Sequence, residues 1–236
     1  MQPEYRKRRD RLKKVIEGLN IDALLVTSLV NVQYLCGFTG SNGFLLISDI
    51  HEILFTDSRY IEQGSEETFN EIDVSLSPGF KGLNGVSGFR KIVNLGFESE
   101  NISHSEFLII GDLLTDRTKL IPTNGVVEKI RSIKDENEID FIKNAACLAD
   151  KAIVHALDLV EPDISESDIA WVIEKFLREN GADDIAFDTI VATGANSSKP
   201  HHRAGPTTVK QGDSLIICLL YTSPSPRDGL LSRMPS

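Results

Sequence analysis

The chain has 236 residues, of which 41% are hydrophobic and 25% are charged, and its formal net charge at pH 7 is −10. This length allows one large domain or two small ones with a substantial core, and the hydrophobic content argues against a disordered chain. The acidic balance argues against nucleic acid as a partner and favours small or neutral substrates.

The N-terminal segment and the cysteines indicate the compartment. Residues 1–19 are basic but lack the apolar core of a signal peptide, and no stretch approaches the ~18 apolar residues of a membrane span. Cys36, Cys147 and Cys218 are far apart and form no CxxC pair, which predicts free thiols. We therefore expect a cytoplasmic protein with no membrane partner.

The first predicted element is an amphipathic helix over residues 4–20 that stops near Gly18 and Asn20. The apolar residues of its one face are Leu12, Val15, Ile16 and Leu19. Five strand-like runs and one helical run follow. The strand-like runs are residues 22–28, 43–48, 51–57, 92–98 and 119–125, and the helical run is residues 103–114. The second and third strand-like runs predict a hairpin, so this part of the chain is expected to be an α/β domain with a mixed sheet.

The pattern becomes helical over residues 126–160, with a break around residues 132–138 and an end at Pro162. A second helix is predicted over residues 164–182, where Ser165 is the N-cap and Gly181 lies near the end. The remaining predicted elements are a strand over residues 187–194, a polar loop over residues 195–213 and a strand over residues 214–217. We place a domain boundary near residue 130, giving domains 1–129 and 130–217, the second of them incomplete.

Three clusters are candidates for chemistry. The polar loop carries His201 and His202, which are either functional or solvated surface residues. Asp57 and Arg59 could bind a charged group, although a structural pairing is the more common use of such a cluster. The glycine-rich stretch 34–43 has no phosphate-binding pattern and predicts a tight connection between strands.

Four motifs together resemble the Xaa-Pro aminopeptidases and prolidases, in the creatinase and methionine-aminopeptidase superfamily of M24 metallopeptidases. The motifs are "YLCGFTGSNGFLLIS", "LFTDSRYIEQ", "IRSIKDENEIDFIKNAACLADKAI" and "FDTIVATGANSSKPHHRAGPTTVKQGDSLII". They occur in the family's order and spacing. The resemblance implies a creatinase-like α/β N-terminal domain and an incomplete α+β pita-bread catalytic domain, in a hydrolase that cleaves the bond before proline.

The resemblance also implies roles for the loop residues. His201 corresponds to a catalytic histidine that hydrogen-bonds the substrate carbonyl or scissile amide and stabilises the tetrahedral intermediate. His202 and Arg203 correspond to substrate-binding positions. The family often has proline after this arginine, whereas this chain has Ala204.

Members of the family hold two divalent ions, manganese, cobalt or zinc, with two Asp, one further His and two Glu. The resemblance places Cys218 where the first Asp belongs, and no segment resembles the other ligands. The chain as written is therefore expected to hold no metal and to be an inactive fragment, whereas its full-length parent would use a metal-activated hydroxide on a proline-containing peptide and form a homodimer.

The last stretch, residues 218–236, matches the codon-by-codon translation of a transposon-type sequencing adapter. We interpret it as a non-native tail and exclude it from fold reasoning. Without further strands, residues 130–217 are expected to expose apolar surface.

Two alternatives stay open. One is a creatinase-like hydrolase that keeps the fold and works without metal. The other is a non-catalytic binding module of the same pita-bread fold. The metal-ligand set and metal content of the parent protein would distinguish both from a peptidase.

Overall fold

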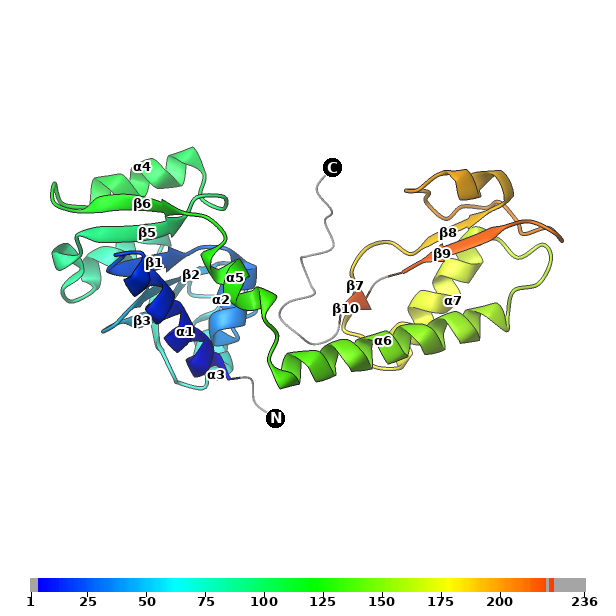
Figure 1. Ribbon diagram of the computed structural model, residues 1–236, viewed down its shortest axis with the longest axis horizontal. Coiled ribbons are helices and arrows are strands. Elements are labelled where there is room, and N and C mark those ends of the chain that lie inside the picture. The colour runs from blue at the N-terminus through cyan, green and yellow to red at the C-terminus, as the bar shows by residue number, and fades with distance from the viewer. Residues whose placement is uncertain (1–3, 220, 223–236) are drawn as a thin grey trace. The chain divides into compact units, whose positions relative to one another are not determined.

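The computed structural model describes residues 4–219 and 221–222, which belong to two compact units (Figure 1). The first unit ends at Ile133 and the second begins at Lys134. The interpretation of residues 218–236 as a non-native tail lies outside the described residues, except at 218, 219, 221 and 222.

The first unit is built on a six-stranded mixed sheet with the strand order β4-β3-β2-β1-β5-β6. Its strands are β1 (Ala23–Val26), β2 (Gly43–Ser48), β3 (Glu52–Thr56), β4 (Asp73–Leu76), β5 (Asn94–Glu98) and β6 (Lys119–Thr123). Strand β2 pairs antiparallel with both β1 and β3, which confirms the predicted hairpin, and the other pairs are parallel. The predicted α/β class with a mixed sheet is therefore confirmed.

Helices cover both faces of this sheet (Figure 1). They are α1 (Tyr5–Gly18), α2 (Leu29–Cys36), α3 (Ile61–Glu67), α4 (His104–Leu113), α5 (Val126–Ser132) and the short 3-10 helices η1 (Gly79–Gly85) and η2 (Phe89–Lys91). On β1, Leu24 and Val26 pack with α1, α2 and α5, whereas Ala23 and Leu25 pack on the face that carries α4. Because side chains alternate along a strand and both faces are covered, the strand is a continuous apolar run.

The burial on α1 differs from the prediction. Leu12 and Ile16 are buried as expected, but Val15 and Leu19 are 38% and 52% exposed. Arg8 and Arg9 are buried instead, at 3% and 1% exposed. Arginine can occupy a core position when its guanidinium is fully paired, a possibility that a hydrophobic pattern does not reveal.

Arg9 meets that condition. Its Nε donates to Glu52 Oε2 at 2.7 Å, and its two terminal nitrogens donate to the Leu35 carbonyl and to Glu71 Oε2, both at 3.0 Å. These partners lie on β3, on α2 and in the loop before β4. One guanidinium therefore fixes α1 against three other segments of the unit.

Helix α2 is absent from the sequence prediction. Gly37, with φ of 87°, ends it, and a Cβ there would come within 2.9 Å of the Glu67 carbonyl oxygen. The glycine-rich stretch therefore connects a helix to β2, which corrects the expected strand-to-strand connection. At the other end of α2, Glu98 accepts hydrogen bonds from the backbone N–H groups of Thr27 and Ser28, both at 2.7 Å.

The second unit contains two long helices, α6 (Glu136–Leu157) and α7 (Glu166–Glu179). The break before α6 is confirmed, and so is the Ser165 N-cap, whose hydroxyl accepts from Asp168 N at 3.1 Å. Helix α6 ends at Leu157 and not at Pro162, because the chain turns there through bonds such as Leu159 N to the Ala156 carbonyl.

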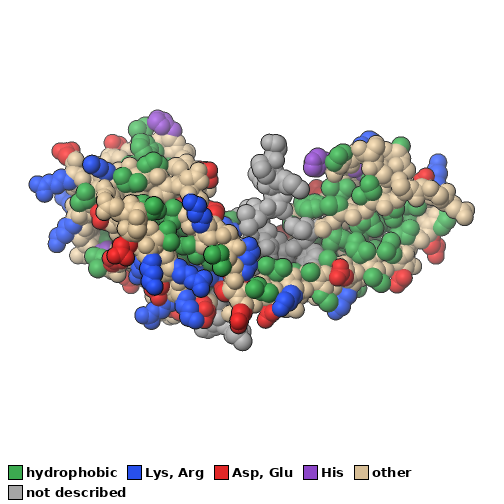
Figure 2. All heavy atoms as spheres, viewed as in Figure 1, with side chains coloured by type: hydrophobic (Ala, Val, Ile, Leu, Met, Phe, Trp, Pro, Cys, Tyr) green, Lys and Arg blue, Asp and Glu red, His purple; other side chains and the backbone are tan. Residues whose placement is uncertain are grey.

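Strands β8 (Ile190–Thr193) and β9 (Leu215–Cys218) pair antiparallel beside α7, and β7 (Asp184–Ile185) pairs with β10 (Tyr221–Thr222). The core of the unit is formed by α6, α7 and the β8–β9 pair. Hydrophobic side chains also gather on the visible surface of this unit (Figure 2). Among the described residues of this unit, the large hydrophobic side chains that are exposed are Ile139, Ile142, Val154, Leu157, Leu159, Trp171 and Ile216.

Two further expectations concern the cysteines and membrane spans. All three cysteines are free thiols, as predicted, and the structure buries Cys36 and exposes Cys147 and Cys218. Among the described residues, no helix is both long enough and apolar enough to cross a membrane.

The Arg9 network generates a stability prediction. Replacing Arg9 with Ala removes three hydrogen bonds and leaves Glu52 and Glu71 without their shared cation, so the free energy of unfolding of the first unit should fall by about 3 kcal/mol. Lys7→Ala removes an exposed pair on the same helix and should change it little. Urea unfolding followed by circular dichroism makes the comparison, and equal effects of the two substitutions would contradict the anchoring role of Arg9.

Candidate functional site

The predicted polar loop, residues 195–213, lies between β8 and β9, and the name is used below for the whole connection, residues 194–214. Its ends are fixed by the strand pair, in which Thr193 lies opposite Leu215. Before β9 the chain makes a tight turn, in which Lys210 N donates to Asp213 Oδ2 at 3.2 Å and Gly212 has φ of 91°. Such a turn favours glycine at the left-handed position.

The polar loop also pairs with the start of α7. Glu166 N donates to the Thr207 carbonyl at 2.9 Å, and Ser167 N donates to the Gly205 carbonyl at 3.0 Å. The first N–H groups of a helix have no partner within the helix, so these carbonyls satisfy them. The backbone of the loop is thereby attached to the N-terminus of α7.

A single side chain at that N-terminus, Glu166, makes the central contacts of the loop. Its carboxylate is fully buried, at 0% exposed. Oε1 accepts from Thr193 N and Asn196 Nδ2, both at 2.9 Å. Oε2 accepts from His202 Nε2 at 2.7 Å and Gly205 N at 3.2 Å. Both oxygens therefore have two donors each.

These donors decide the charge of the group. Burial is the largest single influence and would raise the pKa of Glu166, but the hydrogen bonds from His202, Asn196, Thr193 and Gly205 together lower it below its usual value. Hydrogen bonds to the charged form favour ionisation. The carboxylate is therefore ionised at neutral pH, and because it only accepts, His202 Nε2 carries the proton of the shared hydrogen bond.

The three residues predicted for the site lie close together on the polar loop but in different environments. His201 is exposed, and no described residue hydrogen-bonds its imidazole. His202 is half-buried with its ring turned toward Glu166. Arg203 is exposed. His201 and Arg203 are thus exposed on the loop, whereas the His202 ring is held by Glu166.

A small hollow of about 320 Å³ lies beside His202 and Arg203. Its wall on α7 includes Trp171, the only tryptophan of the chain, which is 63% exposed. Asp188, before β8, lines the same hollow. This side of the loop therefore offers an aromatic ring and both signs of charge.

The described residues do not fit a two-metal centre by themselves. Among them, no group of three or more His, Cys, Asp or Glu side chains lies close enough to hold a metal ion. Cys218, at the position expected for the first Asp, is exposed at the end of β9 opposite Ile190. One thiol in that place is not the oxygen-rich set that such a centre uses.

The Asp57 cluster has a structural pairing. The Asp57 carboxylate accepts from Arg59 N and Nε, both at 3.0 Å, from Arg59 Nη2 at 2.8 Å and from Asn42 Nδ2 at 2.7 Å. The hydrogen bonds from Arg59 and then Asn42 are the main reason that the pKa of Asp57 is held far below its usual range. The structural interpretation of Asp57 and Arg59 is the one that these contacts support.

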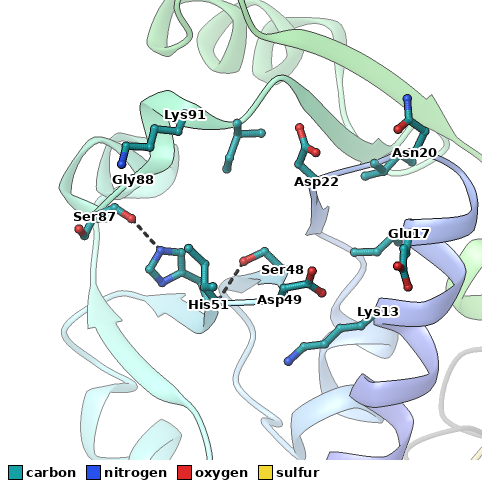
Figure 3. Close-up of a pocket in the computed structure, with 14 residues that line it drawn as sticks. Lys13, Glu17, Asn20, Asp22, Ser48, Asp49, His51, Ser87, Gly88 and Lys91 are labelled. Atoms are coloured by element: carbon teal, nitrogen blue, oxygen red, sulfur yellow. Dashed lines mark hydrogen bonds between the residues drawn. The ribbon is translucent and has the colours of Figure 1, made fainter.

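The first unit has a hollow of its own, of about 600 Å³, between the end of α1 and the β2–β3 turn (Figure 3). His51 donates from Nε2 to the Ser87 carbonyl at 2.7 Å on one side of it, and Lys13 and Asp22 line the opposite side. None of the residues predicted for the site lines this hollow.

Sequence reasoning identified the histidines but not Glu166. A signal was present, because Glu166 lies three and seven residues before Ile169 and Ile173, on the buried stripe of α7. A carboxylate at a position where helical spacing demands an apolar residue indicates a buried charge with dedicated donors. The sequence does not show which donors these are, since they come from residues 193–205.

Comparison with protein families gives two matches. The creatinase/prolidase N-terminal domain matches residues 8–133, and metallopeptidase family M24 matches residues 140–222. An uncharacterised peptidase of Bacillus subtilis, YqhT, is 36% identical over 210 residues, which are 88% of this chain and 59% of that protein. A Xaa-Pro dipeptidase of Pyrococcus horikoshii is 29% identical, over 89% of this chain and 59% of its own length.

Solved structures give the same result. A Xaa-Pro dipeptidase from Bacillus anthracis superposes with a TM-score of 0.84 at 31% identity, over 92% of this chain and 61% of that one. An X-Pro aminopeptidase from Thermotoga maritima gives 0.79 at 32% identity, over 92% and 61%. The chain spans about three-fifths of the length of the relatives that it matches.

The lowered pKa of Glu166 predicts an acid-sensitive second unit. A carboxylate whose folded pKa lies below its unfolded value of about 4.3 contributes its full stability above that value and loses it as the pH falls through the folded pKa. The wild-type chain should therefore be more stable than Glu166→Gln at about pH 6, and the difference should shrink toward about pH 3.

Unfolding monitored by the emission of Trp171, which lies in the second unit, measures this difference. Asp168→Asn, which changes an exposed carboxylate in the same helical turn, serves as the control. A stability difference for Glu166→Gln that stays constant over this pH range would contradict an ionised Glu166.

Proposed function

Because the chain belongs to metallopeptidase family M24 and has its creatinase/prolidase N-terminal domain, we propose that its parent protein is a Xaa-Pro peptidase. The substrate is a peptide whose second residue is proline, and the reaction is hydrolysis of the bond before that proline. The relatives from Pyrococcus and Thermotoga carry Xaa-Pro peptidase names and support this class. The observation that carries the proposal is the anchored polar loop with His201 exposed on it.

In this proposal His201 is the catalytic residue. An exposed imidazole on a loop fixed at both ends can donate a hydrogen bond to the substrate carbonyl and strengthen that bond as negative charge develops on the oxygen. A neutral imidazole suits this task near pH 7 because it can both donate and accept. A loop that is already ordered does not have to be fixed during the reaction.

His202 and Arg203, which follow His201 in the chain, differ in how freely they can contact a substrate. Arg203 is exposed and lines the same hollow as Trp171. There the Arg203 guanidinium could bind the carboxylate of a short peptide. The sequence also predicts His202 as a substrate contact. Its Nε2 is committed to Glu166, so only Nδ1 remains for such a contact.

The family implies two divalent ions, manganese, cobalt or zinc, which supply a hydroxide nucleophile when bound. The described residues do not fit such a pair, and the expected first ligand position holds Cys218. We propose that the ligands belong to the parent protein and that the 236-residue chain is an inactive fragment of it. A cytoplasmic location and a homodimer are part of the same proposal.

The proposal is tested by hydrolysis assays on two proteins. A product of the native gene containing residues 1–217 should, with added Mn²⁺, cleave Leu-Pro much faster than Leu-Gly. The 236-residue chain should cleave neither under the same conditions. Hydrolysis of Leu-Pro by the 236-residue chain would refute the fragment interpretation, and equal rates on both dipeptides would refute the substrate class.

The role of His201 is tested in the longer protein. His201→Ala removes a donor to the developing oxyanion and should lower kcat by about 10²- to 10³-fold. His104→Ala, an exposed histidine at the start of α4, is the matched control and should have no effect. If the two variants keep equal activity, His201 has no catalytic role.

A further inference from the structure

The buried carboxylate of Glu166 connects the end of β8 and the start of the polar loop to the part of the loop that follows its tip. Through Oε1 it binds Thr193 and Asn196, which precede the tip. Through Oε2 it binds His202 and Gly205, which follow it. The tip, residues 197–201, is thus bracketed by one side chain and includes His201.

The contact with His202 is the most direct constraint on His201. The two residues are adjacent in the chain, so fixing the His202 ring fixes the backbone that carries His201. The His202 ring lies 2.7 Å from Glu166 Oε2, between a fully buried charge and the hollow lined by Arg203 and Trp171. Its orientation is therefore set by the carboxylate.

From this geometry we infer that Glu166 is a positioning residue for the proposed reaction, which acts through the His202 ring to hold His201 toward the substrate. The effect on catalysis rests on the proposed function, whereas the orientation of the His202 ring by Glu166 does not. It assigns His202 to positioning and not to direct contact with the substrate. Glu166 itself touches no reacting atom and is not a catalytic residue.

The chemistry of the pair makes the inference specific. Glu166 can only accept, so it selects the His202 tautomer that is protonated on Nε2. A glutamine at position 202 carries an amide N–H₂ at a similar reach and can donate to the same oxygen. An alanine there cannot. A positioning role predicts that glutamine substitutes for the histidine, whereas a substrate contact through Nδ1 predicts that it does not.

The structural part is tested on the 236-residue chain by NMR of its histidine rings. In the wild-type chain His202 should show the Nε2-protonated pattern with a slowly exchanging ring proton, and Asp168→Asn should leave this pattern unchanged. Glu166→Gln places an amide where two of the four donors point and should abolish it. Glu166→Asp, which keeps the charge, should retain part of it. Identical His202 signals in the wild type and Glu166→Gln would overturn the inference.

The kinetic part uses the longer protein with Leu-Pro as substrate. His202→Ala should lower kcat by about a hundredfold with little change in KM, because the catalytic group is displaced while substrate contacts remain. His202→Gln should recover most of that loss. A His202→Gln enzyme as slow as His202→Ala would overturn the inference, and this comparison remains available if Glu166→Gln does not fold.

The proposed function and the positioning role of Glu166 can be refuted independently of each other. A longer wild-type protein without Xaa-Pro hydrolysis would refute the proposed function, while the NMR comparison would still decide whether Glu166 orients His202. An active protein with an unaltered His202 ring in Glu166→Gln would refute the positioning role alone.

Discussion

A carboxylate removed from water requires donors for both of its oxygens, and in the second unit this requirement organises the polar loop. Glu166 has no exposed surface. Its four donors are Thr193 at the end of β8, Asn196 in η3 (Gly194–Ser198), and His202 and Gly205 further along the loop. Leaving such a charge unpaired would cost several kcal/mol, so the loop cannot rearrange without replacing these bonds. The exposed position of His201 depends on that constraint.

A second buried glutamate, Glu98, shows how the surrounding residues set the direction of a pKa shift. Glu98 in the first unit accepts from Thr27 N, Ser28 N and Asn31 Nδ2. Burial dominates there, and with the nearby Glu128 carboxylate it raises the pKa of Glu98. Glu166 has a histidine as its neighbour instead of an acid, and its pKa is lowered. Glu98 fixes the start of a helix, whereas Glu166 fixes the residues of the proposed site.

The two units of the chain differ in how their apolar side chains are buried. The first unit has apolar clusters on both faces of its sheet, and Arg9 joins α1 to segments distant in sequence. The second unit has a core between α6, α7 and β8–β9, together with several exposed apolar side chains. The polar loop lies on this second unit, and so do the hydrogen-bond donors of Glu166 described above.

Local signals in the sequence determined many of the helices and strands, although α2, α3 and β4 were not predicted. The β2–β3 hairpin, α4, the break before α6 and the Ser165 cap follow from alternation, helical spacing and capping chemistry, and the "PHHR" motif indicated His201. Only the tertiary structure decided that Arg8 and Arg9 are buried in place of Val15 and Leu19, and that Glu166 accepts four hydrogen bonds. The physical reason is that a charged side chain is buried only if its partners are in place, and those partners come from residues far along the chain.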